Sequence, residues 1–227
     1  MENMFSEPDL DKRSTLLDFA TEALRNAILN EEVKPGERVN EITFTNKLGI
    51  SRTTFREALR QMEQVGLLVR IPFRGTFVRE YSEEEIQDLN NLRGVLETYA
   101  AEIIIQNGDN QPEKLLPLYQ LAAQMEGVDP QKEAARINDL QITFHRTLLN
   151  LAGSRLFLTA WDNLAQQFWV AMRISQLSAL ARGKNLNLAE AHRAVADAIA
   201  SGNVNRTREM IHEHVFYSFD TPGHEGA

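Results

Sequence analysis

A twelve-residue segment, residues 49–60, constrains the fold of the first part of the chain more than any other. In its sequence, GISRTTFREALR, Gly49 permits a tight turn, and Ser51 is a good N-cap for the helix that the following residues predict. Its apolar residues share one helix face, whereas hydroxyls and arginines lead the other: Ser51, Arg52, Thr53, Thr54 and Arg56. Such a helix start can bind phosphate, and arginine can pair with guanine. These residues alone are equally compatible with a solvated surface helix.

The residues around this segment have the spacing of a helix-turn-helix. Residues 14–29 carry an apolar helical stripe, and residues 41–48 predict a short helix with Asn40 as its cap. Residues 52–65 then predict the second helix of the pair. Residues 1–13 are expected to form a tail. The first part of the chain is therefore predicted to contain three helices.

A pair of strands is predicted next. Residues 67–71 and 76–79 read as strands, and the turn between them has a basic tip at Arg74 and Gly75. A two-stranded wing behind a helix-turn-helix makes a winged helix, in which Arg74 is placed to reach phosphate or the minor groove. We therefore expect a DNA-binding winged-helix domain over residues 14–80. Considered without the helix pair, the two strands could equally form a small ribbon with a purely structural role.

The distribution of charge supports this division, although the net charge of −8 does not suggest a nucleic-acid partner. Residues 36–79 carry eight basic and four acidic residues, which is a net charge of +4. Residues 81–227 carry 12 basic and 19 acidic residues, which is a net charge of −7. A basic module joined to an acidic one is typical of a regulator with a separate sensing domain.

Composition excludes several other classes of protein. The chain of 227 residues can form one large domain or two small ones, and it has no cysteine, so disulfides and thiolate metal sites are excluded. It contains no apolar run near eighteen residues, and its first ten residues are acidic and polar, unlike a signal peptide. We therefore expect a soluble, cytoplasmic protein with no membrane partner.

The second part of the chain is predicted to be an all-α bundle. Ser82 is a cap followed by acidic residues, and no strand pattern occurs after residue 80. Residues 177–185 are expected to form a loop, and residues 221–227 a tail. The expected domain covers residues 81–220 and has six helices, at about 83–106, 112–125, 130–151, 154–175, 188–200 and 203–219.

Three histidines lie on the apolar faces of three predicted helices: His145, His192 and His214. His212 lies off that face and is expected to point to solvent or to a helix edge. A single histidine on an apolar face is usually a hydrogen-bonded core residue. Three that converge would suit a divalent cation such as Zn²⁺ or Ni²⁺, which prefers neutral nitrogen ligands. Periodicity alone leaves a metal site and a polar core equally open.

Several segments resemble the winged-helix module of GntR-type regulators, and the resemblance covers about residues 15–79. They occur in the order and spacing of that family: VKPGERV at 33–39, LGISRTTFREAL at 48–59, GLL at 66–68 and RGTFV at 74–78. Two positions depart from the pattern. Ile42 stands where an arginine that reaches DNA is common, and Phe73 stands where a wing glycine is common. These departures imply an operator preference or affinity that differs from the usual pattern.

The resemblance also implies which residues contact DNA. Arg52 and Arg56 would make the main base or phosphate contacts. The hydroxyl groups of Ser51, Thr53 and Thr54 would bind phosphates of the DNA backbone. Arg74 and Gly75 would form the tip of the wing.

Residues 83–219 resemble the effector domain of the FadR branch of GntR regulators, the FCD domain. The segments that carry the resemblance are RGVLE at 93–97, FHRTL at 144–148, AGS at 152–154, EAHRAV at 190–195 and HV at 214–215. In that family an aspartate and three histidines bind a metal, and a small carboxylate effector often completes its coordination. His145, His192 and His214 fall on the histidine positions. Gln141 falls on the aspartate position.

Two effector contacts are expected, one from the resemblance and one from helix periodicity. Arg93 matches a family position that faces the cavity, and Asn138 lies on the same side of its helix as His145. Arg93 also has Glu97 one turn later, so a salt bridge between these two residues is an alternative that does not exclude the first.

The amide at Gln141 leaves three interpretations of the site open, because an amide is a weaker ligand than a carboxylate. Three histidines with Gln141 or water could hold a metal and leave positions open for an anionic ligand. The same residues could bind an organic acid directly, without metal. They could also form a polar core without a ligand. Asp139 lies about 200° round the helix from Gln141 and cannot replace the missing carboxylate.

These observations favour a transcription regulator, in particular a repressor controlled by a small organic acid. Two copies would form a homodimer on a roughly palindromic double-stranded DNA operator. A metal-dependent enzyme is the alternative from another class, but it would need a general base beside the histidines and would leave the winged helix unexplained. A constitutive architectural DNA-binding protein would not need the buried polar cluster.

Overall fold

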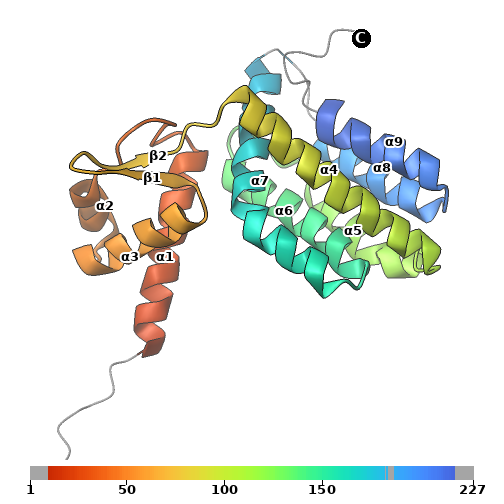
Figure 1. Cartoon of the computed structure of the whole chain (residues 1–227), viewed down its shortest axis with the longest axis horizontal. Coiled ribbons are helices and arrows are strands. Elements are labelled where there is room, and N and C mark those ends of the chain that lie inside the picture. Colours follow the sequence, from red (N-terminus) through yellow and green to blue (C-terminus); the bar gives the residue numbers. More distant parts are fainter. Residues whose placement is uncertain (1–9, 182, 184–186, 218–227) are drawn as a thin grey trace, which may run out of the picture. The chain divides into compact units, whose positions relative to one another are not determined.

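The computed structural model of the chain describes residues 10–181, 183 and 187–217, which fall into two units that divide between Glu80 and Tyr81. The first unit contains three helices and two strands, all labelled in Figure 1: α1 (Leu10–Leu29), α2 (Glu41–Leu48), α3 (Arg52–Gln64), β1 (Leu68–Ile71) and β2 (Gly75–Val78). The strands pair antiparallel, from Leu68 opposite Val78 to Ile71 opposite Gly75. In the second unit every secondary-structure element among the described residues is a helix. The predicted fold class is therefore confirmed.

Local capping explains the geometry of the helix pair in the first unit. The Asn40 side chain accepts hydrogen bonds from the first amides of α2, and Gly49 ends that helix at a φ of 67°. Ser51 then caps α3, where its hydroxyl oxygen accepts from the Thr54 amide at 3.1 Å. The Phe44 and Phe55 rings stack with their centroids 5.3 Å apart, and this contact joins α2 to α3. The opposite face of α3, which carries Arg52, Thr53, Arg56 and Arg60, is exposed to solvent.

The first helix is longer than predicted. It begins at Leu10, so the predicted tail over residues 1–13 is wrong for residues 10–13. The segment Leu10-Asp11-Lys12-Arg13 contains no glycine or proline, and leucine, lysine and arginine are good helix formers. Residues 1–9 lie outside the described residues.

The second unit is a bundle in which one long helix contacts most of the others. Its elements are α4 (Glu83–Gln106), α5 (Pro112–Gln124), α6 (Ala134–Leu151), α7 (Arg155–Ala181), α8 (Leu188–Ala200), α9 (Val204–His212) and a π-helix, η1 (Glu213–Tyr217). In Figure 1, α4 lies between α6 and α7 on one side and α8 and α9 on the other, and it contacts all four. Ser82 and Glu85 form a reciprocal capping box that begins α4.

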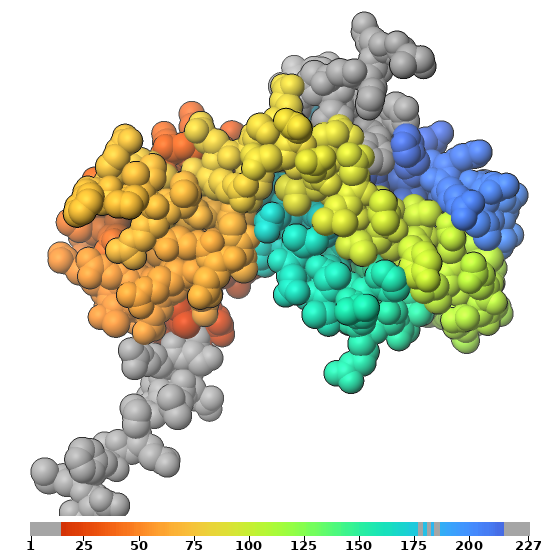
Figure 2. Space-filling view, in the orientation of Figure 1, coloured from red at the N-terminus to blue at the C-terminus, as the bar shows by residue number. Residues whose placement is uncertain are grey.

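The interior of the bundle is apolar apart from a few polar groups. Large side chains on several helices are fully buried, including Phe144, Trp161 and Phe168. On the face shown in Figure 2, side chains of the bundle close over this interior. The polar side chains that lie inside are consequently removed from water. No helix among the described residues is long and apolar enough to cross a membrane.

Three predicted boundaries in the bundle are wrong. α6 begins at Ala134 and not at Pro130, because the Asp129 carboxylate accepts from the amides of Gln131 and Lys132 and holds the chain in a turn. The predicted loop covers residues 177–185, but α7 continues to Ala181, so residues 177–181 are helical. No glycine or proline interrupts that stretch.

The third difference is at the end of the bundle. The predicted helix over residues 203–219 is α9 followed by the π-helix, which contains His214. Single turns of π-helix are uncommon and frequently occur at functional sites. The predicted tail over residues 221–227, and the positions 182 and 184–186 of the predicted loop, lie outside the described residues.

Candidate functional site

The exposed start of α3 presents most of the residues that were predicted to contact DNA. Ser51, Arg52, Thr53 and Arg56 are exposed. Thr54 is not: it is 8% exposed, and its hydroxyl group lies 2.8 Å from that of Ser51. Thr54 therefore supports the N-cap, and its phosphate contact stays a prediction.

Arg56 already has an acidic partner on α2. Its Nε lies 2.8 Å from Glu41 Oε2, and both side chains are partly exposed to solvent. An exposed ion pair of this kind contributes only about 0–1 kcal/mol, so a phosphate group can displace the carboxylate at little cost. Ile42, next to Glu41, is 56% exposed and offers no polar group to a partner.

The wing tip is held in a tight turn. Phe73 has a φ of 61° and is fully exposed, and Gly75 has a φ of 107°, a backbone conformation that favours glycine. Arg74 is exposed, with its guanidinium 5.7 Å from the centroid of the Phe77 ring. The predicted tip residues Arg74 and Gly75 therefore lie at the end of the hairpin.

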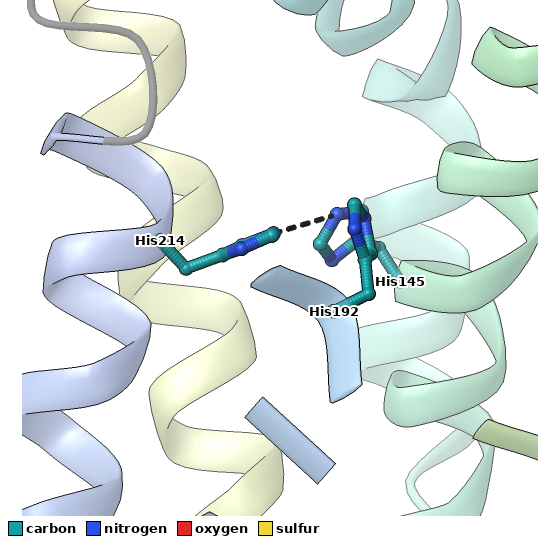
Figure 3. A group of neighbouring side chains, drawn as sticks. All are labelled: His145, His192 and His214. Atoms are coloured by element: carbon teal, nitrogen blue, oxygen red, sulfur yellow. Dashed lines mark hydrogen bonds between the residues drawn. The ribbon is translucent and has the colours of Figure 1, made fainter. Parts of the chain in front are cut away.

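The three predicted histidines meet inside the bundle (Figure 3). His145 comes from α6, His192 from α8 and His214 from η1, and all three are buried. One ring nitrogen from each lies within 4.8 Å of the others. His214 points at the other two rings, and its Nε2 lies 3.4 Å from His145 Nε2. His212 is exposed.

Neighbouring groups define which nitrogen of two rings is protonated. His192 Nδ1 donates to the Leu188 carbonyl oxygen at 2.7 Å, so its Nε2 carries the lone pair. His145 Nδ1 lies 3.0 Å from Glu97 Oε1, and the carboxylate favours the tautomer that has its proton on Nδ1. Among the described residues, neither His192 Nε2 nor His214 Nδ1 has a hydrogen-bond partner. Unpaired acceptors in a buried cluster are costly unless a cation or a bound ligand satisfies them.

Glu97 was not predicted as part of this site. It is 0% exposed, and its Oε1 lies 3.0 Å from both His145 Nδ1 and Arg93 Nε. The only sequence signal was its spacing of one turn from Arg93 on the inner face of α4. The predicted alternative of an Arg93–Glu97 salt bridge is confirmed. Arg93 Nη2 has no hydrogen-bond partner among the residues that the structure describes.

The two amides predicted near the site are both buried on α6. Gln141 Nε2 donates to the Ile137 carbonyl oxygen of the same helix at 3.3 Å. Asn138 Nδ2 donates to the Trp169 carbonyl oxygen at 3.1 Å, whereas Asn138 Oδ1 has no partner within the described part of the chain. Asp139 is exposed, as expected from its position on the helix.

Burial keeps the histidines neutral. Burial, together with the charge of Arg93, lowers the pKa of His145 although Glu97 works to raise it, and burial holds the pKa of His192 and His214 well below the usual range. Burial also works to raise the pKa of Glu97, but His145 and Arg93 outweigh it and the pKa of Glu97 is lowered. The cluster therefore combines three neutral imidazoles with an ionised carboxylate–guanidinium pair.

These two sites define a class of protein: a winged-helix DNA-binding unit joined to a helical bundle with a buried polar centre. Comparison with known families agrees. Residues 16–78 match the bacterial regulatory proteins of the gntR family, and residues 88–216, more than half of the chain, match the FCD domain. The chain belongs to the GntR family of DNA-binding transcription regulators and carries an FCD domain.

Known proteins of similar sequence include two regulators of bacterial operons. The chain is 26% identical over 208 residues to the "Probable D-xylose utilization operon transcriptional repressor" of Paenarthrobacter nicotinovorans, covering 89% of this chain and 87% of that protein. It is 24% identical over 191 residues to the "Nta operon transcriptional regulator" of Aminobacter aminovorans, covering 82% and 85%.

Solved structures share the fold. A GntR transcriptional regulator from Rhodococcus sp. RHA1 superposes with a TM-score of 0.66 at 21% identity, covering 88% of this chain and 94% of that one. McbR/YncC of E. coli superposes with a TM-score of 0.67, also at 21% identity, covering 88% and 93%.

Proposed function

We propose that this protein is a repressor that binds a roughly palindromic operator as a homodimer and releases it when a small organic acid binds in the bundle. Relatives that are named repressors support repression. The homodimer and the palindromic operator belong together in this proposal, because the symmetry of a dimer mirrors that of its two DNA half-sites. The observation that carries the proposal is the cluster of His145, His192 and His214. Three buried imidazoles from three elements, with unpaired nitrogens, have the chemistry of a ligand site inside a sensing domain. We also place the chain in the FadR branch.

The donor set fits a divalent metal ion such as Zn²⁺ or Ni²⁺. Neutral imidazole nitrogens are preferred ligands of both ions, and three protein ligands leave at least one coordination position open. Metal-binding histidines usually donate their other N–H to a carboxylate or a backbone carbonyl group. Glu97 provides such a carboxylate for His145, and Leu188 provides such a carbonyl group for His192. In a metal centre both residues would fix the ring orientation of a ligand.

The charges around the cluster favour an anionic effector. Arg93 and Glu97 cancel each other, and the three histidines and Gln141 are neutral. A divalent cation would consequently bring an uncompensated charge of about +2 into a buried site, which is costly. A carboxylate bound at the open position would compensate part of that charge. Gln141 Oε1 would be a weak additional ligand, and Arg93 and Asn138 would contact the effector.

Regulation requires that the effector bind the two states of the protein with different affinities. An acid that binds more tightly when the protein is released from DNA shifts the population toward that state. By linkage, DNA binding then weakens the binding of the acid by the same factor. η1 contains His214, and α4 carries Glu97, which contacts His145. These two elements are therefore candidates for the part of the bundle that moves when the effector binds.

A second candidate is a metal-free sensor of organic acids. The observation in its favour is Gln141, since an amide at the position of the family's carboxylate weakens a metal site. In this case the histidine nitrogens and the guanidinium of Arg93 would bind the carboxylate directly.

Metal content distinguishes the two candidates. Protein purified without chelators or an affinity tag that binds metal is expected to contain about one divalent ion per chain by elemental analysis, because three converging imidazoles bind such ions tightly. His192→Ala should reduce this content at least 10-fold. His212→Ala, which changes an exposed histidine outside the cluster, is the control and should have no effect. Wild-type protein without stoichiometric metal, even after incubation with Zn²⁺ or Ni²⁺, would refute the metal centre and leave the metal-free sensor.

A further inference from the structure

A segment before the helix pair adds an extra edge to the wing. Gly36 N donates to Val78 O at 3.0 Å, Val78 N donates to Glu37 O at 2.9 Å, and Val39 N donates to Thr76 O at 2.9 Å. Arg38 is thereby bridged to Phe77 in an antiparallel arrangement. Residues 36–39 pair with β2, and Arg38 is fixed beside the wing although it precedes α2.

The side chain of Arg38 lies directly on the backbone of Gly75. A Cβ atom at Gly75 would be 2.8 Å from Arg38 Nε, which is closer than Cβ atoms approach other heavy atoms, and 3.2 Å from Arg38 Nη2, which is a tight contact. Gly75 also has a φ of 107°. The backbone conformation therefore favours glycine at the start of β2, and a side chain there would have to displace the Arg38 guanidinium.

Arg38 shares a surface hollow with the two arginines of α3. The hollow has a volume of about 490 Å³ and is lined by Arg38, Arg52 and Arg56, together with Gly75 and Ile42. We call it the arginine hollow. Of its arginines only Arg56 has an ion-pair partner, Glu41; Arg38 and Arg52 make no ion pair with any other described residue. Glu41 also lines the hollow and compensates one of the three positive charges, which leaves an excess of two.

We propose that Arg38 binds a phosphate group of the DNA backbone at the junction between the recognition helix and the wing. This proposal rests on the DNA-binding function and adds a contact outside the helix-turn-helix and the wing tip. An exposed guanidinium with no acidic partner, held against a glycine backbone, is pre-organised for a bidentate contact with phosphate. Ile42 lines the same hollow without a hydrogen-bond donor, so the polar contact there depends on the arginines.

The salt dependence of DNA binding tests this contact. The probe is a fluorescent duplex of the DNA upstream of the protein's own gene, and the dissociation constant is measured by anisotropy at several KCl concentrations. Arg38→Ala is expected to weaken binding about 10-fold at 0.1 M KCl, because a charge-assisted contact is lost. The slope of log K against log salt should become shallower by about 0.9 for each chain bound. Arg38→Lys should retain the slope and lose part of the affinity, since lysine keeps the charge without the bidentate geometry.

Two further variants complete the test. Gly75→Ala should weaken binding in the same direction as Arg38→Ala, because its Cβ would displace the guanidinium. Lys47→Ala is the matched control: it removes one charge from the same unit, but Lys47 pairs with Glu32 and does not line the hollow, so its effect should be below about 2-fold. Wild-type affinity and slope in Arg38→Ala would overturn the proposal while leaving DNA binding intact. Absence of binding by the wild-type protein would instead refute the function on which the proposal rests, and the Arg38 contact with it.

Discussion

Glu97→Ala is expected to destabilise the bundle by about 3–5 kcal/mol, the usual cost of breaking a buried ion pair by removing one partner. Arg93 and Glu97 are 1% and 0% exposed, so the loss of the carboxylate leaves a guanidinium charge in an apolar interior. His145 Nδ1 loses its acceptor at the same time. Urea unfolding followed by tryptophan fluorescence measures the effect in this unit alone, because Trp161 and Trp169 are the two tryptophans of the chain and both belong to α7.

Two controls separate the buried charge from other effects of the substitution. Removing both charges in Arg93→Met/Glu97→Leu should cost much less than Glu97→Ala, since no unpaired charge remains. Glu102→Ala acts on the same helix but breaks the partly exposed pair with Arg208, and it should cost about 1 kcal/mol or less. If Glu97→Ala were no more destabilising than Glu102→Ala, the carboxylate could not be the buried partner of Arg93.

Arg52→Ala and Arg56→Ala are expected to weaken specific DNA binding by about 10- to 100-fold each, in line with about 1–3 kcal/mol for a bidentate contact to a base. The double variant should lose specific binding altogether. Both side chains are exposed on the leading face of α3, and the pair of Arg56 with Glu41 is exposed and readily exchanged for phosphate. Competition between the upstream duplex and a scrambled duplex of equal length, measured by anisotropy, reports the specificity.

A control and a gain of function accompany these variants. Arg136→Ala removes an exposed arginine of the bundle that pairs with Glu133, and it should leave DNA binding unchanged. Ile42→Arg should tighten binding or alter its preference, because it adds a donor to the arginine hollow. Tight specific binding by the double variant Arg52→Ala/Arg56→Ala would show that another surface recognises DNA.

Helix limits could be predicted wherever local chemistry sets them. α2 and the start of α4 agree with prediction because Asn40 and Ser82 are strong caps, and Gly49 ends α2 in a left-handed turn. The predicted start of α6 was wrong because the Asp129 carboxylate accepts hydrogen bonds from the amides of Gln131 and Lys132. Hydrophobic periodicity does not reveal such side-chain bonds to the backbone. The π-helix around His214 has no recognised sequence signal at all.

The candidate sites were predictable only as helix faces. The apolar stripe placed His145, His192 and His214 toward the interior, and the family resemblance grouped them. Periodicity does not measure distances between helices, so the contact of Glu97 on α4 with His145 on α6 could not be foreseen. Arg38 was missed for a similar reason, because its place beside Gly75 depends on the pairing of residues 36–39 with β2.

The coupling between the two sites gives the most direct test of the proposed function. Small mono-, di- and hydroxycarboxylates are first screened for the acid that raises the melting temperature of the metal-loaded protein most. A ligand at 100 times its dissociation constant adds about 2.7 kcal/mol to the free energy of unfolding. The affinity for the upstream duplex is then measured for metal-free and metal-loaded protein, each with and without that acid. We expect the acid to weaken DNA binding of the metal-loaded protein by about 5- to 150-fold, the usual range of allosteric coupling, and to have little effect on His192→Ala. Equal DNA affinity in all four conditions, with the acid shown to be bound, would contradict the account.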